Sequence, residues 1–297
     1  MNGTRFLDPH ILARIDNLDL LARTVVDGFI NGLHRSPYFG LSTDFAEHRQ
    51  YTPGDDIRRI DWRVFGRTDR FYVKQFEADT NANFSILFDI SRSMAYGSNA
   101  ITKLDYGRYL AACLSYMSRK QRDRVGMVTF DDDVRDFIPT SAKHLDLVLH
   151  CIDRIRPGAQ GDLTRPLMKV AESISRRSIL LLISDLYEEP ATIARNLARL
   201  RDKGHDVIVF HILDPAEIAF PFEEASQFED METGELIPVV PEIQRDEYRH
   251  LMAQHLEAIS QRLVRDRIDY VLIETSKPLD FALFEYLARR EALARVR

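Results

Sequence analysis

Cysteine and long apolar runs are scarce in this 297-residue chain, and each scarcity excludes a class of protein. With only two cysteines, Cys113 and Cys151, a disulfide scaffold or a thiolate metal site is not expected. Both fall on the apolar faces of predicted helices, where a free thiol behaves as a small hydrophobic group. No apolar stretch reaches membrane-spanning length, and the first 30 residues, broken by charges, lack the layout of a secretory signal.

An excess of positive charge is also missing. The chain has 40 lysines and arginines against 46 aspartates and glutamates, which gives a formal net charge of -6. It therefore has no general attraction for phosphate backbones or anionic lipids. We expect a cytoplasmic protein with neither nucleic acid nor a membrane as partner. The hydrophobic fraction of 45% is ample for a packed core.

From residue 84 onward, apolar runs alternate with helical patterns. The runs are continuous enough for strands that are buried on both faces. Strands that alternate with helices pair in parallel through right-handed crossovers, which predicts a doubly wound, mostly parallel α/β sheet flanked by helices. A short antiparallel edge strand is expected after the second main strand, beyond an acidic turn at 131–133. The main strands are predicted at 84–88, 124–130, 179–183, 206–212 and 269–273.

Residues 1–83 form a distinct N-terminal segment ahead of this α/β domain at 84–297. It begins with a helical pattern at 8–34 and continues into a turn-rich stretch with a predicted strand at 71–76. Trp62 is read as an anchor that packs this segment on the sheet domain. The arginines around it alternate with aspartates, so local ion pairing is favoured over phosphate binding (Arg58, Arg59, Arg63, Arg67 and Arg70 with Asp55, Asp56, Asp61 and Asp69).

A second interruption lies at 215–241. This stretch carries four prolines and a Thr233-Gly234 turn between two short strand-like runs. We interpret it as a hairpin inserted after the strand predicted at 206–212, which is the fifth when the edge strand is counted.

The stretch "ILFDISRSM" places Asp89, Ser91 and Ser93 at alternate positions directly after a buried strand. In an open parallel sheet, ligands bind at the carboxyl ends of the strands. Asp185 follows another buried strand, and Thr164 lies in the loop before the helix that leads to that strand. Carboxylates and hydroxyls are hard oxygen ligands, which suit Mg²⁺ or Mn²⁺. Five such side chains leave one position of a six-ligand shell for a group from outside.

This arrangement resembles the von Willebrand factor A domain over roughly residues 83–290. The metal-ion-dependent adhesion site of that domain uses Asp-x-Ser-x-Ser, a Thr from a second loop and an Asp from a third. The resemblance assigns Asp89, Ser91, Ser93, Thr164 and Asp185 to the metal shell, with a partner's carboxylate at the open position. The chain departs from the pattern at Asp162-Leu163, where many relatives have glycines before the threonine.

A second, longer motif limits the resemblance to one family. It is the stretch "YTPGDDIRRIDWRVFGRTDRFYVKQFEADT" followed by "DISRSM". It is similar to a family of unknown function with a von Willebrand A-like domain, commonly encoded beside MoxR-type AAA+ ATPases. Larger members carry membrane helices ahead of this region, so we expect the short, soluble form. The resemblance implies a non-catalytic partner of such an ATPase in remodelling, assembling or metallating an unknown client protein.

Other interpretations of Asp89, Ser91 and Ser93 stay open. Ser and Asp after a strand often cap the next helix, and a structural domain with a vestigial site would look the same. A Mg²⁺-dependent phosphatase or phosphotransferase of the haloacid dehalogenase type also places an aspartate after its first strand. Such an enzyme needs a second acid where this chain has Ser91, which cannot shuttle a proton at neutral pH. Since Gly-x-x-x-x-Gly-Lys-Ser/Thr and Gly-x-Gly-x-x-Gly loops are also absent, a binding module is favoured over an enzyme.

Overall fold

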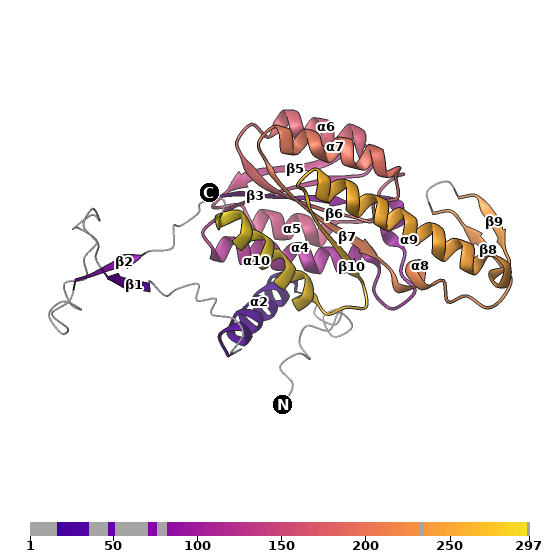
Figure 1. Ribbon diagram of the computed structural model, residues 1–297, viewed down its shortest axis with the longest axis horizontal. Coiled ribbons are helices and arrows are strands. Elements are labelled where there is room, and N and C mark those ends of the chain that lie inside the picture. The colour runs from indigo at the N-terminus through magenta and orange to yellow at the C-terminus, as the bar shows by residue number, and fades with distance from the viewer. Residues whose placement is uncertain (1–16, 36–46, 51–70, 76–81, 232–233, 296–297) are drawn as a thin grey trace.

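The computed structural model describes residues 17–35, 47–50, 71–75, 82–231 and 234–295 (Figure 1). Its centre is a six-stranded sheet with the order β10-β7-β6-β3-β4-β5. Neighbouring strands are parallel except β5, which is antiparallel to β4. The predicted mostly parallel α/β sheet with an antiparallel edge strand is therefore confirmed. The strands are β3 (Asn83–Asp89), β4 (Arg124–Phe130), β5 (Val134–Ser141), β6 (Ser178–Ser184), β7 (Asp206–Leu213) and β10 (Asp269–Glu274).

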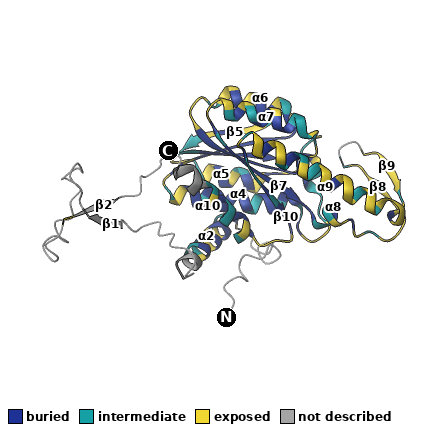
Figure 2. Ribbon diagram, in the orientation of Figure 1, coloured by how far each residue is buried: buried dark blue, intermediate teal, exposed yellow. Residues whose placement is uncertain are grey.

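Helices cover both faces of the sheet (Figure 1). Successive side chains of a strand point to opposite faces, so Ile86 and Phe88 contribute to one core cluster and Leu87 to another. The first cluster is shared with α2 (Leu18–Arg35), α4 (Lys103–Lys120), α5 (Leu145–Arg154) and α10 (Leu279–Arg295). The second is shared with α6 (Thr164–Ser173), α7 (Pro190–Asp202) and α9 (Pro241–Arg265). The central strands are consequently buried on both sides, as Figure 2 shows in dark blue.

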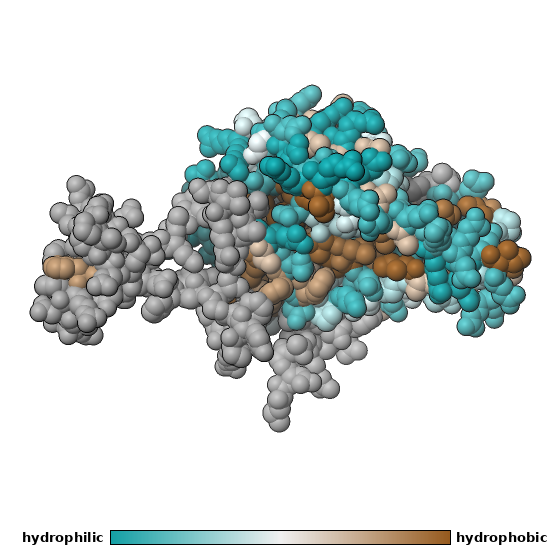
Figure 3. All heavy atoms as spheres, viewed as in Figure 1, coloured by the Kyte–Doolittle hydropathy of each residue, from teal (hydrophilic) through white to brown (hydrophobic). Residues whose placement is uncertain are grey.

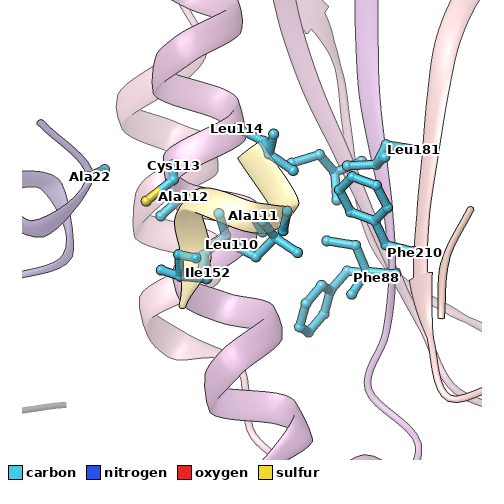
Figure 4. Close-up of a cluster of buried hydrophobic side chains, with 14 of the residues drawn as sticks. Ala22, Phe88, Leu110, Ala111, Ala112, Cys113, Leu114, Ile152, Leu181 and Phe210 are labelled. Atoms are coloured by element: carbon cyan, nitrogen blue, oxygen red, sulfur yellow. The ribbon is translucent and has the colours of Figure 1, made fainter. Parts of the chain in front are cut away.

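The N-terminal helix α2 packs on α4. Its apolar residues Leu21, Val25 and Val26 are buried in the first core cluster, and Ala22 faces Cys113 of α4 in Figure 4. Strands β1 (Glu47–Gln50) and β2 (Tyr72–Gln75) form a separate antiparallel pair. Trp62 and the arginines and aspartates around it lie outside the described residues. None of the helices that the structure describes is long and apolar enough to cross a membrane.

Close packing of α4 on the sheet depends on Gly107. A Cβ at this position would lie 2.7 Å from the Phe88 ring. We expect Gly107→Ala to lower the free energy of unfolding by about 1–3 kcal/mol, because the ring has to move within a packed core. Gly28→Ala in α2 is the matched control, since its Cβ would meet nothing within 4 Å. It should raise stability by about 0.5–1 kcal/mol. Urea denaturation of both variants checks this, and equal effects would contradict it.

The predicted hairpin insertion forms an arm beside the sheet. We define the hairpin arm as residues 215–247, which contain α8 (Pro215–Ala219), β8 (Ser226–Glu229), β9 (Leu236–Val239) and the start of α9. Four aromatic rings with centroids 4.6–5.8 Å apart join β8 to α8 and α9: Phe220, Phe222, Phe228 and Tyr248. The arm is therefore a packed element at one end of the molecule (Figure 1).

Candidate metal centre

The candidate site lies at the carboxyl ends of β3 and β6. From β3 the chain continues to β4 on one side, and it later returns to β6 on the other side. Open α/β sheets bind ligands at the strand ends where the strand order reverses in this way. Asp89 ends β3, and Asp185 directly follows Ser184, the last residue of β6. The structure therefore brings both predicted carboxylates to the same edge of the sheet.

The loop after β3 gathers Asp89, Ser91 and Ser93. The Ser91 N–H donates to Asp89 Oδ1 at 2.9 Å, which folds the chain back on the strand end. A turn of 3-10 helix, η3 (Arg92–Ala95), follows and curls the backbone. It places the Ser91 and Ser93 hydroxyl oxygens 3.1 Å apart. Three oxygen-bearing side chains thus cluster here, as the spacing predicts.

A second loop packs against the first. The Gly158 N–H donates to the Ile90 carbonyl at 2.6 Å, and the Arg92 N–H donates to the Ala159 carbonyl at 3.0 Å. At Gly161 a Cβ would lie 3.0 Å from the Ser91 Cβ, so the two loops are in close contact here and a side chain would push Ser91 slightly away. The acidic run at 131–133 helps to fix the loop, because Asp131 Oδ2 accepts from the Ala159 N–H at 3.0 Å.

Thr164 sits differently from the prediction. It is the first residue of α6 and not a loop residue. Its hydroxyl oxygen accepts a hydrogen bond from Asn196 of α7 at 2.9 Å, and its N–H donates to Asp162 at 2.7 Å. The side chain of Asp162, where the chain departs from the pattern, therefore accepts a hydrogen bond from the first N–H of α6. A hydroxyl has two lone pairs, so the Thr164 oxygen keeps one for a further contact.

Asp185 forms an ion pair with Lys103, which was not predicted from the sequence. The Lys103 Nζ donates to Asp185 Oδ2 at 2.7 Å and to Glu217 Oε1 at 2.6 Å. Lys103 is fully buried, and Asp185 is almost so. The signal in the sequence was the position of this lysine in the first turn of a helix, where the helix dipole disfavours a cation. A lysine placed there needs carboxylate partners.

Burial and neighbouring charges shift the pKa values of Asp89 and Lys103. Burial, together with the nearby Asp185 charge, raises the pKa of Asp89 to about 7, against the lowering effect of hydrogen bonds from Ser184 and Ser91. The Ser184 hydroxyl donates to Asp89 Oδ2 at 2.6 Å. Burial lowers the pKa of Lys103, but Asp185 and Glu217 outweigh it and leave that pKa above its usual value. Asp89 is thus a buried carboxylate whose ionised form is destabilised.

This donor set fits a hard divalent cation. In the ranges that the structure describes, three or more His, Cys, Asp or Glu side chains are nowhere grouped to hold a metal. A site here has to combine a carboxylate with hydroxyls, which suits Mg²⁺ or Mn²⁺ and not Zn²⁺. Asp89, Ser91 and Ser93 are joined by hydrogen bonds in one loop, and an ion bound there would stabilise the ionised form of Asp89.

The fold defines an α/β-sheet protein similar to other solved structures. BatB from Bacteroides thetaiotaomicron is 18% identical with a TM-score of 0.51, and the match covers 70% of this chain and 98% of BatB. The SpRpn10 VWA domain is 14% identical with a TM-score of 0.40, over 67% of this chain and 92% of that domain. The similarity to BatB shows the fold alone.

The chain belongs to the family described as "Protein of unknown function DUF58", whose model matches residues 47–258. Among curated proteins it is similar to the uncharacterised protein Rv1480 of Mycobacterium tuberculosis. The two are 26% identical over 296 residues, which cover 97% of this chain and 92% of the relative.

Proposed function

We propose that this protein is a non-catalytic protein-binding module in which a divalent cation, Mg²⁺ or Mn²⁺, completes the contact with a partner's carboxylate. The observation that carries the proposal is the environment of Asp89. Its carboxylate is buried, accepts hydrogen bonds from the neutral Ser91 N–H and Ser184 hydroxyl, and lies close enough to Asp185 to have its pKa raised. A cation beside the Ser91 and Ser93 hydroxyls would offset the cost of this buried charge.

Each chain group has a distinct role in this proposal. Asp89, Ser91 and Ser93 hold the ion directly. Asp185 contributes negative charge while its Oδ2 is shared with Lys103, and Thr164 contributes its remaining lone pair. The ion supplies an electrophilic point that attracts an acidic side chain of the partner. The ends of β3 and β6 and the loops that follow them would shield the ion from solvent.

The proposed partners follow from the resemblance of the N-terminal stretch and the "DISRSM" motif. One is a MoxR-type AAA+ ATPase, and the other is a client protein that the ATPase remodels, assembles or supplies with metal. A cytoplasmic site of action fits such an ATPase. The client would present an Asp or Glu side chain to the ion.

Calorimetric titration with Mg²⁺ and Mn²⁺ tests the metal site. We expect Ser91→Ala to weaken binding by at least tenfold, because one oxygen ligand is lost. Ser98→Ala is the matched control, since the Ser98 hydroxyl donates to Asp214 and not to the site. Pull-down of the proposed partner, a MoxR-type ATPase, should fail in EDTA and with Ser91→Ala. If neither Mg²⁺ nor Mn²⁺ releases or absorbs heat on titration, the proposal is refuted. It is also refuted if the ATPase is still pulled down in EDTA and with Ser91→Ala.

A further inference from the structure

The hairpin arm exposes large apolar side chains that its own packing does not use. Ile243 is 77% exposed and Leu236 is 57% exposed, and Ile237 and Val240 also face solvent. All four lie within eight residues, from β9 to the start of α9, and Leu236 points to the opposite face of the hairpin from Ile237. Figure 3 shows hydrophobic residues in brown at this end of the molecule, among hydrophilic ones in teal. Clustered exposed apolar residues with a polar rim mark interaction surfaces.

The rim of this surface is acidic. Between residues 215 and 247 the chain has ten aspartates and glutamates but a single basic residue, Arg245. The arginine donates a hydrogen bond to the Phe222 carbonyl at 2.5 Å, so it is directed at the arm's own backbone. Exposed carboxylate residues flank the apolar group on both strands and on α9: Glu223, Glu224, Glu229, Asp230, Glu235 and Glu242. Such a surface repels acidic partners and anionic lipid, and it attracts basic ones.

The arm is also a firm support for such a contact. Phe228 of β8 packs against Phe220 and Phe222, with ring centroids 5.8 and 4.8 Å away. Pro238 lies within β9 and has no N–H to donate, which disfavours addition of a partner's strand along β9. Recognition therefore rests on side chains presented by a pre-organised surface.

We propose that the hairpin arm is a second docking surface, independent of the metal, for a partner protein that presents apolar residues ringed by lysines or arginines. Ile237, Val240 and Ile243 form its apolar centre, and the carboxylates around them select the basic partner. Central apolar residues carry most of the energy of protein contacts, whereas rim charges set selectivity and association rate.

A defined probe tests the charge and the location of this surface. We suggest a fluorescein-labelled amphipathic helical peptide with leucines on one face and lysines on the other, titrated with the full chain in EDTA at 50 mM NaCl. The double variant Ile237→Ser, Ile243→Ser should weaken binding at least tenfold. Val264→Ser is the matched control, because Val264 is 66% exposed near the other end of α9. It should bind like the wild type.

Three further measurements show whether the surface binds a basic partner, an acidic one or a second copy of this chain. Raising NaCl to 300 mM should weaken binding severalfold, and a peptide with glutamates in place of the lysines should not bind. Equal binding of the glutamate peptide, or no effect of the double variant, would overturn the proposal. So would concentration-dependent dimers in analytical ultracentrifugation that the double variant abolishes, since the occupant would then be a second copy. Because EDTA is present throughout, failure here leaves the metal proposal unaffected.

Discussion

Replacing Asp89 by Asn is expected to stabilise the protein when no metal is present. The Asp89 carboxylate is buried beside Asp185, so its ionised form is costly, and its pKa is raised to about 7. Asparagine keeps the shape and has no charge to bury. At pH 8 in EDTA we expect the free energy of unfolding of Asp89→Asn to exceed that of the wild type by about 2–4 kcal/mol, measured in urea.

The pH dependence has a definite sign. An aspartate that titrates near 3.8 when unfolded and at about 7 when folded binds more protons in the folded state between these values. Wild-type stability in EDTA should therefore fall as pH rises from about 4 to about 7, by up to about 4 kcal/mol. Below pH 4 the aspartate is protonated in both states, so this contribution no longer changes. The Asn variant lacks this slope, so the two proteins should converge near pH 4.

Magnesium should reverse the order of the two proteins. A ligand that binds only the folded state at a thousand times its Kd adds about 4.1 kcal/mol, which exceeds the advantage of about 2–4 kcal/mol of Asp89→Asn. We expect that gain in the wild type and none in Asp89→Asn. Asp153→Asn is the control, because that carboxylate is largely exposed, and it should follow the wild type at each pH. A less stable Asp89→Asn at pH 8 in EDTA would show that Asp89 is not electrostatically strained.

Removing the Lys103 ammonium is expected to be strongly destabilising. Lys103 is fully buried between Asp185 and Glu217, with Nζ–O distances of 2.7 and 2.6 Å. Lys103→Met keeps the apolar stem but leaves two buried carboxylates without their cation. We expect a loss of about 3–5 kcal/mol in the free energy of unfolding, measured in urea at pH 7.

Two further variants identify the cause of this loss. Adding Glu217→Gln to Lys103→Met should recover part of the lost stability, because one of the unpaired charges is removed. Lys169→Met is the matched control, since its bridge to Asp133 is exposed and contributes little. If Lys103→Met unfolds like the wild type, the ion pair has no structural role. The variant should also bind Mg²⁺ more tightly, because Asp185 is no longer shared with the ammonium.

The fold could be predicted because hydrophobic patterning dominates it. The predicted strand at 124–130 agrees with β4, and 84–88 differs from β3 by one residue at each end. Residues such as Leu87 and Leu182 are buried on a sheet face that helices cover, so their runs are continuous and easily recognised. The helix start near residue 8 and the anchoring role of Trp62 stay predictions, because both lie outside the described residues.

The candidate site was predictable only where it is local. Asp89, Ser91 and Ser93 lie within five positions, so their spacing alone indicates that they converge. The Lys103–Asp185 pair joins residues 82 positions apart and depends on how α4 and β6 meet. Thr164 was placed in a loop because the sequence did not show that α6 begins at this residue, where its N–H donates to Asp162.

Helix α9 gives the arm a long stalk. With 25 residues at a rise of about 1.5 Å each, it is roughly 37 Å long, about twice the length of the 13-residue α7 beside it. Its buried residues are spread along its length, with Pro241 and Met252 in the half next to the arm and Ile259 and Leu263 in the half that joins the core cluster on the sheet. The helix therefore links the hairpin to the body of the protein, and a force on the hairpin would be carried through α9 to the adjoining edge strand β10.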